Sequence, residues 1–411
     1  MIISGLKAEK ILDSRGEPSI FVIVETKKGK TKASSPSGKS TGKYEASAFS
    51  SRGVDFSVSF INVIGKKLIA DQTSFRSFED LEKVEKLVRG YDKTKKWEVI
   101  GGNALFALEA AILKAMALDQ GKELWEFLNP GAKSLPYPLG NCIGGGVHSA
   151  KEVHPDIQEF LLMPKARHFY DAYFLNLQSY KVAKHLVALK DRTWGGELTD
   201  EKAICPGLST EEILDVLKEA SDKVSSKYHT SPSIGMDIAA SSLWKNGKYH
   251  YPYAKASLST SQQLDYIKGL IEKYGLFYVE DPFHQEDFAS FAELLKQVKA
   301  SKSKALICGD DLIATQPERL EIAIRTKAIN AVIIKPNQNG SLLGTKKVVD
   351  MAKDNKILPI ISHRSGETAD STISDLAVAW EIPIIKAGIL GKERFAKLHR
   401  LLKIEREMGL K

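Results

Sequence analysis

Three carboxylates and two lysines stand at the ends of short apolar runs in the second half of this chain. Asp237, Glu280 and Asp310 each close such a run, and Lys335 and Lys386 close two later ones. Carboxylate oxygens at one focus are the hard ligands that Mg²⁺ prefers, and a cation relieves their mutual repulsion. A lysine beside a divalent ion and a second ammonium has a lowered pKa, so it can act as a base. The pattern predicts a Mg²⁺-dependent enzyme that removes a proton next to a carboxylate.

A repeated strand–helix unit must hold these residues together. From residue 230 to the C-terminus, an apolar run, an ionisable residue and an amphipathic segment follow one another six times. Five of the runs end at the carboxylates and lysines named above, and the sixth ends at His363. Strands that alternate with helices form parallel sheets, and a closed ring brings their C-terminal ends to one face. In (β/α)8 barrels that face carries the active site. We therefore predict an α/β fold with a (β/α)8-like barrel.

The chain is long enough for a second, smaller domain. Its 411 residues exceed one barrel of roughly 250 residues. Residues 128–138 contain three prolines and a glycine, which predicts a boundary between a domain at 1–130 and a barrel at 136–411. Residues 19–26 begin a predicted hairpin, and residues 103–118 have apolar side chains at helical spacing. The first domain is therefore predicted to be an α+β capping domain.

Composition and charge narrow the class of protein. Hydrophobic residues make up 43% and charged residues 27%, which is typical of a globular protein. The net charge of +8 is spread over segments such as 190–202 and 296–304, so a solvated surface is favoured and a nucleic-acid partner is not predicted. No apolar run reaches the roughly 18 residues of a membrane span, and the start lacks a secretory signal. We expect a cytoplasmic protein with no membrane segment.

Two other kinds of site have little support. Cys142, Cys205 and Cys308 form no CxxC pair, so buried free thiols are favoured over disulfides or a zinc site. The run at 38–41 imitates the end of a nucleotide-binding P-loop. That motif requires glycine where this chain has Ala33, and a helix after it, so a nucleotide triphosphatase is not supported.

A series of short motifs resembles the enolase family, in the order of that family. The run SHRSGET at 362–368 is similar to its phosphate-binding signature. The other matches are ILDSRG at 11–16, PSGKSTG at 36–42, QEF at 158–160, DIAAS at 237–241, EDPF at 280–283, GDDL at 309–312 and KPNQ at 335–338. The resemblance covers about residues 3 to 406. It implies an enolase-type barrel with an N-terminal capping domain, which dehydrates 2-phosphoglycerate to phosphoenolpyruvate in glycolysis and gluconeogenesis.

The resemblance also implies the cofactor and the quaternary structure. Two Mg²⁺ ions per active site would be bound, the first by Asp237, Glu280 and Asp310 and the second by Ser40. The substrate would be a small phosphorylated acid. The chain would form a homodimer or an assembly of dimers.

Catalytic and substrate-binding roles follow from the same matches. Lys335 would remove the C2 proton, and Lys386 and the cations would stabilise the resulting anion. Glu201, paired with Glu159, would protonate the departing C3 hydroxyl. The remaining residues would bind the substrate and its phosphate: His148, His363, Arg364 and Ser365.

Three loops depart from the family pattern. Lys39 replaces the usual alanine beside the second metal position, and the sequence at 199–203 lacks two glycines of the family's Gly-Asp-Glu-Gly-Gly loop. Glu197 is therefore an alternative to Glu201 for the acid. The loop at 144–149 also differs from its family counterpart.

These departures leave two alternatives to an enolase. One is an enolase-like lyase with a different hydroxy-acid substrate, and the other is a non-catalytic binding protein on the same scaffold. Retention of Lys335, Lys386 and Glu159 argues against the binding protein, because a binder needs no lysine base opposite a metal. The intact SHRS sequence at 362–365 favours a phosphorylated substrate.

Overall fold

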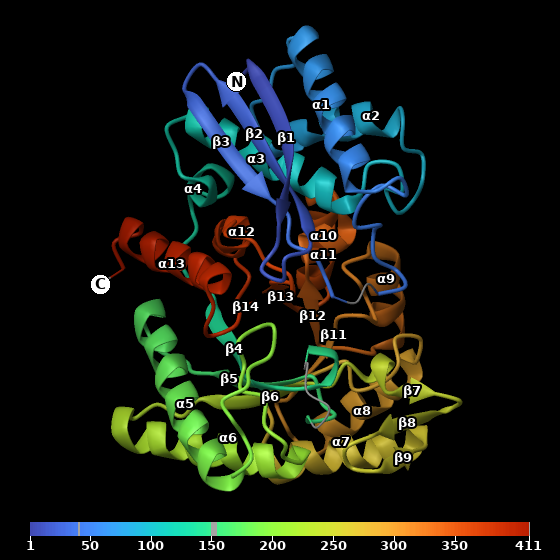
Figure 1. Ribbon diagram of the computed structural model, residues 1–411, viewed down its shortest axis with the longest axis vertical. Coiled ribbons are helices and arrows are strands. Elements are labelled where there is room, and N and C mark those ends of the chain that lie inside the picture. Colours follow the sequence, from blue (N-terminus) through green and yellow to red (C-terminus); the bar gives the residue numbers. More distant parts are fainter. Residues whose placement is uncertain (40–41, 149–153, 411) are drawn as a thin grey trace.

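The computed structural model describes residues 1–39, 42–148 and 154–410. A smaller N-terminal module lies at one end of the long axis and a barrel at the other (Figure 1). The module contains an antiparallel sheet in the order β1-β2-β3. Its strands are β1 (Gly5–Leu12), β2 (Pro18–Thr26) and β3 (Gly29–Ser34). The predicted hairpin is confirmed, because β2 pairs antiparallel with β3.

Helices complete the N-terminal module. They are α1 (Val54–Ala70), α2 (Leu81–Arg89), α3 (Gly102–Asp119) and α4 (Leu124–Leu128). The helix predicted at 103–118 is confirmed as α3, which packs against β2 and β3. Nearly all of its side chains are buried, because it also contacts α10 (Pro336–Asn339) and α11 (Leu342–Asp354) of the barrel. The module therefore sits directly on the barrel.

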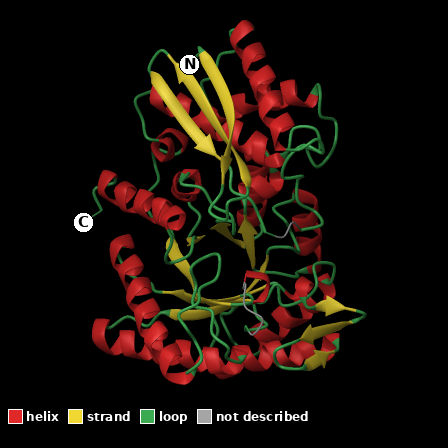
Figure 2. Ribbon diagram, in the orientation of Figure 1, coloured by secondary structure: helices red, strands yellow, loops and turns green. Residues whose placement is uncertain are grey.

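Eight strands close the barrel in the order β10-β11-β12-β13-β14-β4-β5-β6. They are β4 (Tyr137–Gly144), β5 (Glu159–Met163), β6 (Ser233–Asp237), β10 (Tyr278–Glu280), β11 (Leu306–Gly309), β12 (Ala331–Ile334), β13 (Leu358–Ser362) and β14 (Ile384–Lys386). The other barrel helices are α5 (Phe169–Lys190), α6 (Thr210–Tyr228), α7 (Thr260–Tyr274), α8 (Phe288–Ala300), α9 (Pro317–Thr326), α12 (Thr372–Ala379) and α13 (Lys392–Glu407). Helices surround the strands, which confirms the predicted α/β barrel (Figure 2).

A small three-stranded sheet projects from the side of the barrel (Figure 1). Its strands are β7 (Trp244–Lys245), β8 (Lys248–Tyr251) and β9 (Ala256–Leu258).

The strand β5 departs from the all-parallel arrangement expected of a strand–helix repeat. It pairs antiparallel with both β4 and β6. No α-helix lies in the described part of the β4–β5 connection, and a direct return without a crossover helix produces an antiparallel pair. The first residue of β5, Glu159, is consequently in register with Asp237 at the end of β6. The reversal of β5 thus brings a strand-start residue to the face that carries the other strands' ends.

The closed barrel has a packed interior. Buried side chains from seven of its strands fill it: Leu139, Leu161, Met163, Tyr278, Cys308, Ala331, Ile333, Ile360 and Ile384. A larger cluster packs the strands against the helices and continues into the N-terminal module. Cys142 and Cys308 are free and buried, as predicted, and Cys205 is also buried. Among the described helices, none is long and apolar enough to cross a membrane.

Several barrel helices begin at caps that are visible in the sequence. Ser209 and Ser259 each accept the backbone N–H of the residue three positions later, which satisfies an N–H group that has no partner within the helix. The helix α7 ends at Gly275, whose φ of 61° is in the left-handed region that glycine adopts without steric cost. Local signals therefore fix where these helices begin and end, and so where the neighbouring strands can lie.

Candidate active site

A polar cavity of about 260 Å³ opens at the C-terminal ends of the barrel strands. Ten of the residues predicted for the site line it: His148, Glu159, Glu201, Asp237, Asp310, Lys335, His363, Arg364, Ser365 and Lys386. Glu280 is fully buried just behind this lining, where it contacts Lys386. Ser40 lies outside the described residues. The structure therefore brings together every predicted site residue that it describes.

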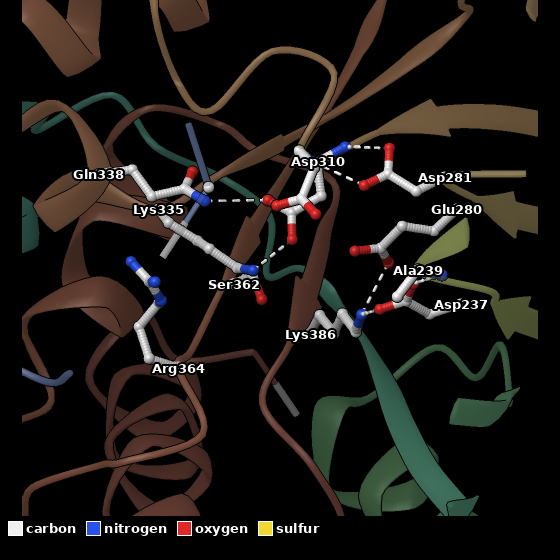
Figure 3. A network of polar contacts seen from close by, with 12 residues as sticks. Asp237, Ala239, Glu280, Asp281, Asp310, Lys335, Gln338, Ser362, Arg364 and Lys386 are labelled. Carbon is white, nitrogen blue, oxygen red and sulfur yellow. Dashed lines mark hydrogen bonds and ion pairs between the residues drawn. The ribbon is translucent and has the colours of Figure 1, made fainter. Parts of the chain in front are cut away.

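Lys386 is the centre of a buried cluster of carboxylates. Its Nζ lies 2.7 Å from Oε2 of Glu280 and 2.9 Å from Oδ2 of Asp237 (Figure 3). It also lies 2.8 Å from Oε2 of Glu159. Its ammonium donates hydrogen bonds to Asp237 and Glu280, and its contact with Glu159 is an ion pair. The carboxylates come from β10, β5 and β6, which lie side by side in the barrel. Lys386 is thereby fixed in position and held as the cation.

Lys335 approaches the acidic cluster from the other side. Its Nζ pairs with Oδ2 of Asp310, whose Oδ1 accepts an N–H of Gln338 at 3.1 Å (Figure 3). Although burial alone would lower it, the charge of Asp310 raises the pKa of Lys335 above its ordinary value. This direction reflects the pairing with Asp310, so the lowered pKa expected of a lysine beside a divalent ion stays a prediction.

A second acidic residue follows the end of β10. Asp281 accepts the backbone N–H groups of Asp310 and Asp311, at 3.0 and 2.7 Å. Ligand atoms of these three residues lie within 4.8 Å of one another. Burial and the neighbouring charge of Asp311 raise the pKa of Asp281 well above its ordinary value. These carboxylates thus extend the acidic cluster beyond the three predicted ligands.

The chemistry of this cluster fits a hard divalent cation. Oε1 of Glu280 is buried and has no hydrogen-bond partner among the described residues. Burial and the charge of Asp237 raise the pKa of Glu280 well above its ordinary value, so a carboxylate here needs more positive charge than Lys386 supplies. Carboxylate oxygens in such numbers are typical ligands of Mg²⁺. Asp237, Glu280 and Asp310 can therefore contribute to holding one cation, and the position of a second falls on a segment that is not described.

An acid pair lies next to Lys386 in the cavity lining. Ligand atoms of His148, Glu159 and Glu201 lie within 4.8 Å of one another. Burial raises the pKa of Glu159 to about 8, and the neighbouring charge of Glu201 contributes in the same direction. Two carboxyl groups this close hold one proton between them at neutral pH. The pair can therefore supply a proton to a group in the cavity.

Two histidines contact this pair or its loop. Nδ1 of His148 lies 3.0 Å from Oδ1 of Asp200, and Nε2 of His363 lies 3.6 Å from Oε2 of Glu201. Burial holds the pKa of His363 well below its ordinary value, so its ring is neutral. Glu201 lines the cavity, whereas Glu197 accepts the backbone N–H of Gly195 in a nearby turn. The geometry therefore favours Glu201 over its alternative.

A basic corner completes the cavity. Nη1 of Arg364 lies 2.8 Å from Oε2 of Glu45, a residue of the N-terminal module. The hydroxyl of Ser365 accepts the backbone N–H of Lys39 at 2.8 Å and an N–H of Arg15 at 3.3 Å. Arg394 is buried and donates to the backbone carbonyl of Ser365 at 2.7 Å. Positive groups from both domains thus converge where an anion such as phosphate can bind.

Sequence reasoning missed several of these residues. Asp281, Asp311 and Gln338 fall inside motifs that were matched, so their place beside a strand-end residue was an available signal. Glu45 and Arg394 carry no such signal. They reach the site only because the N-terminal module and α13 pack on the barrel.

Comparison with known proteins agrees with this arrangement. Residues 3–128 match the family model described as the enolase N-terminal domain, and residues 132–411 match the enolase C-terminal TIM barrel domain. Enolase from Methanothermobacter thermautotrophicus is 39% identical over 412 residues, which cover 99% of this chain and 97% of the relative. Enolases from Archaeoglobus fulgidus and Pyrobaculum aerophilum are 39% and 37% identical, and cover 99% and 100% of this chain and 98% and 97% of each relative.

Proposed function

Because this chain belongs to the enolase family, we propose that it dehydrates 2-phosphoglycerate to phosphoenolpyruvate, with two Mg²⁺ ions per active site. One observation carries the proposal. The partly buried Lys335 and the buried Lys386 approach one carboxylate cluster from two sides (Figure 3). A proton-holding glutamate pair lines the same cavity. This is an arrangement for removing a proton beside a carboxylate and then expelling a hydroxyl.

The first cation would be held by Asp237, Glu280 and Asp310, whose oxygens fit it as described above. When bound, it would neutralise Asp310 and the substrate carboxylate, which lowers both the pKa of Lys335 and the free energy of the developing carbanion. Lys335 then removes the C2 proton with its Nζ. Lys386 keeps its charge, because three carboxylates surround it, and it stabilises the negative charge that forms.

The glutamate pair acts in the second half of the reaction. Glu201 protonates the C3 hydroxyl so that it leaves as water, and Glu159 shares that proton with it. His148 and His363 border the pair and shape the pocket around the leaving group. Burial of both carboxyls excludes the water that would otherwise exchange this proton.

Arg364 and Ser365 bind the substrate phosphate. A guanidinium offers two parallel N–H donors to an anion, and Arg394 and Arg15 hold the segment that carries it. The intact phosphate corner supports a phosphorylated substrate over an unphosphorylated hydroxy acid.

The test is formation of the enol product from 2-phosphoglycerate, followed by its ultraviolet absorbance across a Mg²⁺ titration. Lys335→Ala should lower kcat by about 10²- to 10⁴-fold or more, while the calorimetric Kd for substrate stays within about threefold. Lys346→Ala, which removes a partly exposed lysine of α11 outside the cavity, is the matched control. Full turnover by Lys335→Ala would refute the base assignment, and no turnover by wild type at any Mg²⁺ concentration would refute the function.

We further propose the finer features of the assembly. Residues 1–130 and 136–411 form the two domains, and the chain assembles as a homodimer or a set of dimers in the cytoplasm. Sedimentation velocity would test the dimer, since a monomeric boundary at micromolar concentration contradicts it. Limited proteolysis would test the division, with cleavage expected first between residues 130 and 136.

A further inference from the structure

Tyr278 is a polar side chain in the apolar interior of the barrel. It is fully buried at the start of β10, in the layer formed by Leu161, Cys308 and other interior residues. Its hydroxyl donates a hydrogen bond to Oε2 of Glu280. The two residues are two positions apart on one strand, so their side chains point to the same face and can meet. The barrel interior is thereby linked directly to the carboxylate cluster of the cavity.

The two oxygens of Glu280 have different surroundings. Oε2 accepts from Tyr278 and also from Nζ of Lys386 at 2.7 Å. Oε1 is buried and has no hydrogen-bond partner among the described residues. A phenol is protonated at neutral pH, so Tyr278 can only donate to the carboxylate. Two donors on one oxygen fix the rotation of the carboxylate and leave the other oxygen available.

The hydroxyl has no evident packing role. A phenylalanine would fill the same space without the cost of desolvating an O–H group. Carboxylates that ligate metals are commonly held by such hydrogen bonds from behind, and loss of the partner weakens metal binding about 10- to 100-fold.

We propose that Tyr278 is a positioning residue of the cation site, whose hydroxyl holds Oε2 of Glu280 so that Oε1 is the oxygen presented to Mg²⁺. The inference rests on the Mg²⁺ site of the proposed function, but not on the identity of the substrate. It predicts that affinity for the metal, rather than the chemical step, depends on this one hydroxyl.

The test compares Tyr278→Phe with wild type by calorimetric titration with Mg²⁺ alone, and by the Mg²⁺ concentration that half-activates turnover. Tyr278→Phe should weaken Mg²⁺ binding and shift half-activation by about 10-fold or more. At saturating Mg²⁺, kcat should recover to within about threefold. Tyr251→Phe is the matched control, because Tyr251 is also buried and donates to Gln263, outside the site. That control should shift neither Mg²⁺ readout by more than about twofold.

A double variant separates the positioning role of Tyr278 from a general loss of structure. In Glu280→Gln, adding Tyr278→Phe should not weaken Mg²⁺ binding further, because the carboxylate that the hydroxyl orients is gone. Unchanged Mg²⁺ affinity in Tyr278→Phe, an equal loss in the Glu280→Gln background, or no Mg²⁺ binding by wild type would each overturn the proposal. If wild type binds Mg²⁺ without dehydrating 2-phosphoglycerate, the proposed function fails, while the calorimetric comparison still decides the role of Tyr278.

Discussion

Lys39 provides a quantitative test of how this chain departs from the family's loop. Its Nζ lies 3.8 Å from Oδ2 of Asp200, and 42% of its side chain is exposed. Its backbone N–H donates to Ser365, and Asp200 also contacts His148. Lys39→Ala therefore removes an ion pair between an exposed lysine and a partly buried carboxylate, and leaves the backbone contact to the phosphate corner in place. We expect the lysine to be tolerated in the site, not to block it.

The structure sets the size of the effect. Two unit charges 3.8 Å apart attract by about 1.1 kcal/mol in water. Side-chain entropy and salt reduce exposed pairs to below about 1 kcal/mol, which corresponds to a factor of about 5. Lys39→Ala should therefore lower kcat/KM by no more than about fivefold. The loss should shrink further at about 0.5 M salt, because screening weakens both the pair and the attraction for an anionic substrate.

The assay is kcat/KM for 2-phosphoglycerate at low and high salt, with Mg²⁺ saturating. Lys10→Ala is the control, because Lys10 is similarly exposed and forms an ion pair with Asp55 on the N-terminal module, outside the cavity. A gain above about tenfold in Lys39→Ala would mean that the lysine obstructs the site. A loss above about 100-fold would mean that it binds the substrate directly. Either result refutes the reasoning from an exposed pair.

Three further predictions concern other charged groups. Arg364→Lys should raise KM at least about tenfold, with a smaller effect on kcat. An ammonium cannot replace the paired N–H donors that the guanidinium offers to Glu45 and to phosphate. An unchanged KM would contradict this. Glu201→Gln should lower kcat by about 10²- to 10⁴-fold without changing the affinity for Mg²⁺. Glu197 lies outside the cavity, so Glu197→Gln should have little effect on kcat. Equal kcat values for the two variants would reject Glu201 as the acid. Burial and the nearby Glu85 hold the pKa of Glu109 well above its ordinary value, so the fold binds a proton that the unfolded chain releases above about pH 4.3. The folded state therefore gains its full stabilisation from this bound proton below that pH. The gain is lost, by up to about 1.4 kcal/mol of unfolding free energy per pH unit, as the pH rises through the folded pKa of Glu109. The Tm of Glu109→Gln should exceed that of wild type by a margin that widens from pH 5 to pH 8. The exposed control Glu82→Gln should follow the wild-type curve of Tm against pH. A Glu109→Gln curve that runs parallel to these two would contradict the prediction.

The barrel and much of its site could be predicted because their signals are local. Each apolar run is followed by its ionisable residue within the same few positions, so Asp237, Glu280 and Lys335 could be placed at strand ends from the sequence alone. Parallel strands in a ring must present those ends together. The same logic failed for β5, which turns back after a connection whose described part contains no α-helix, and Glu159 reaches the cavity from a strand start.

What the sequence determined by itself was the fold class, the family motifs and the types of chemical group on the active face. The tertiary structure decided how those groups pair. Lys386 meets carboxylates from three strands, Arg364 meets Glu45 from the other domain, and Tyr278 meets Glu280 inside the barrel. Such pairings set the pKa of each group and decide which ligand atoms remain available for a cation. They depend on distances between residues that are far apart in the chain. Local spacing could not supply those distances, because they exist only once the barrel has closed and the N-terminal module has packed on it.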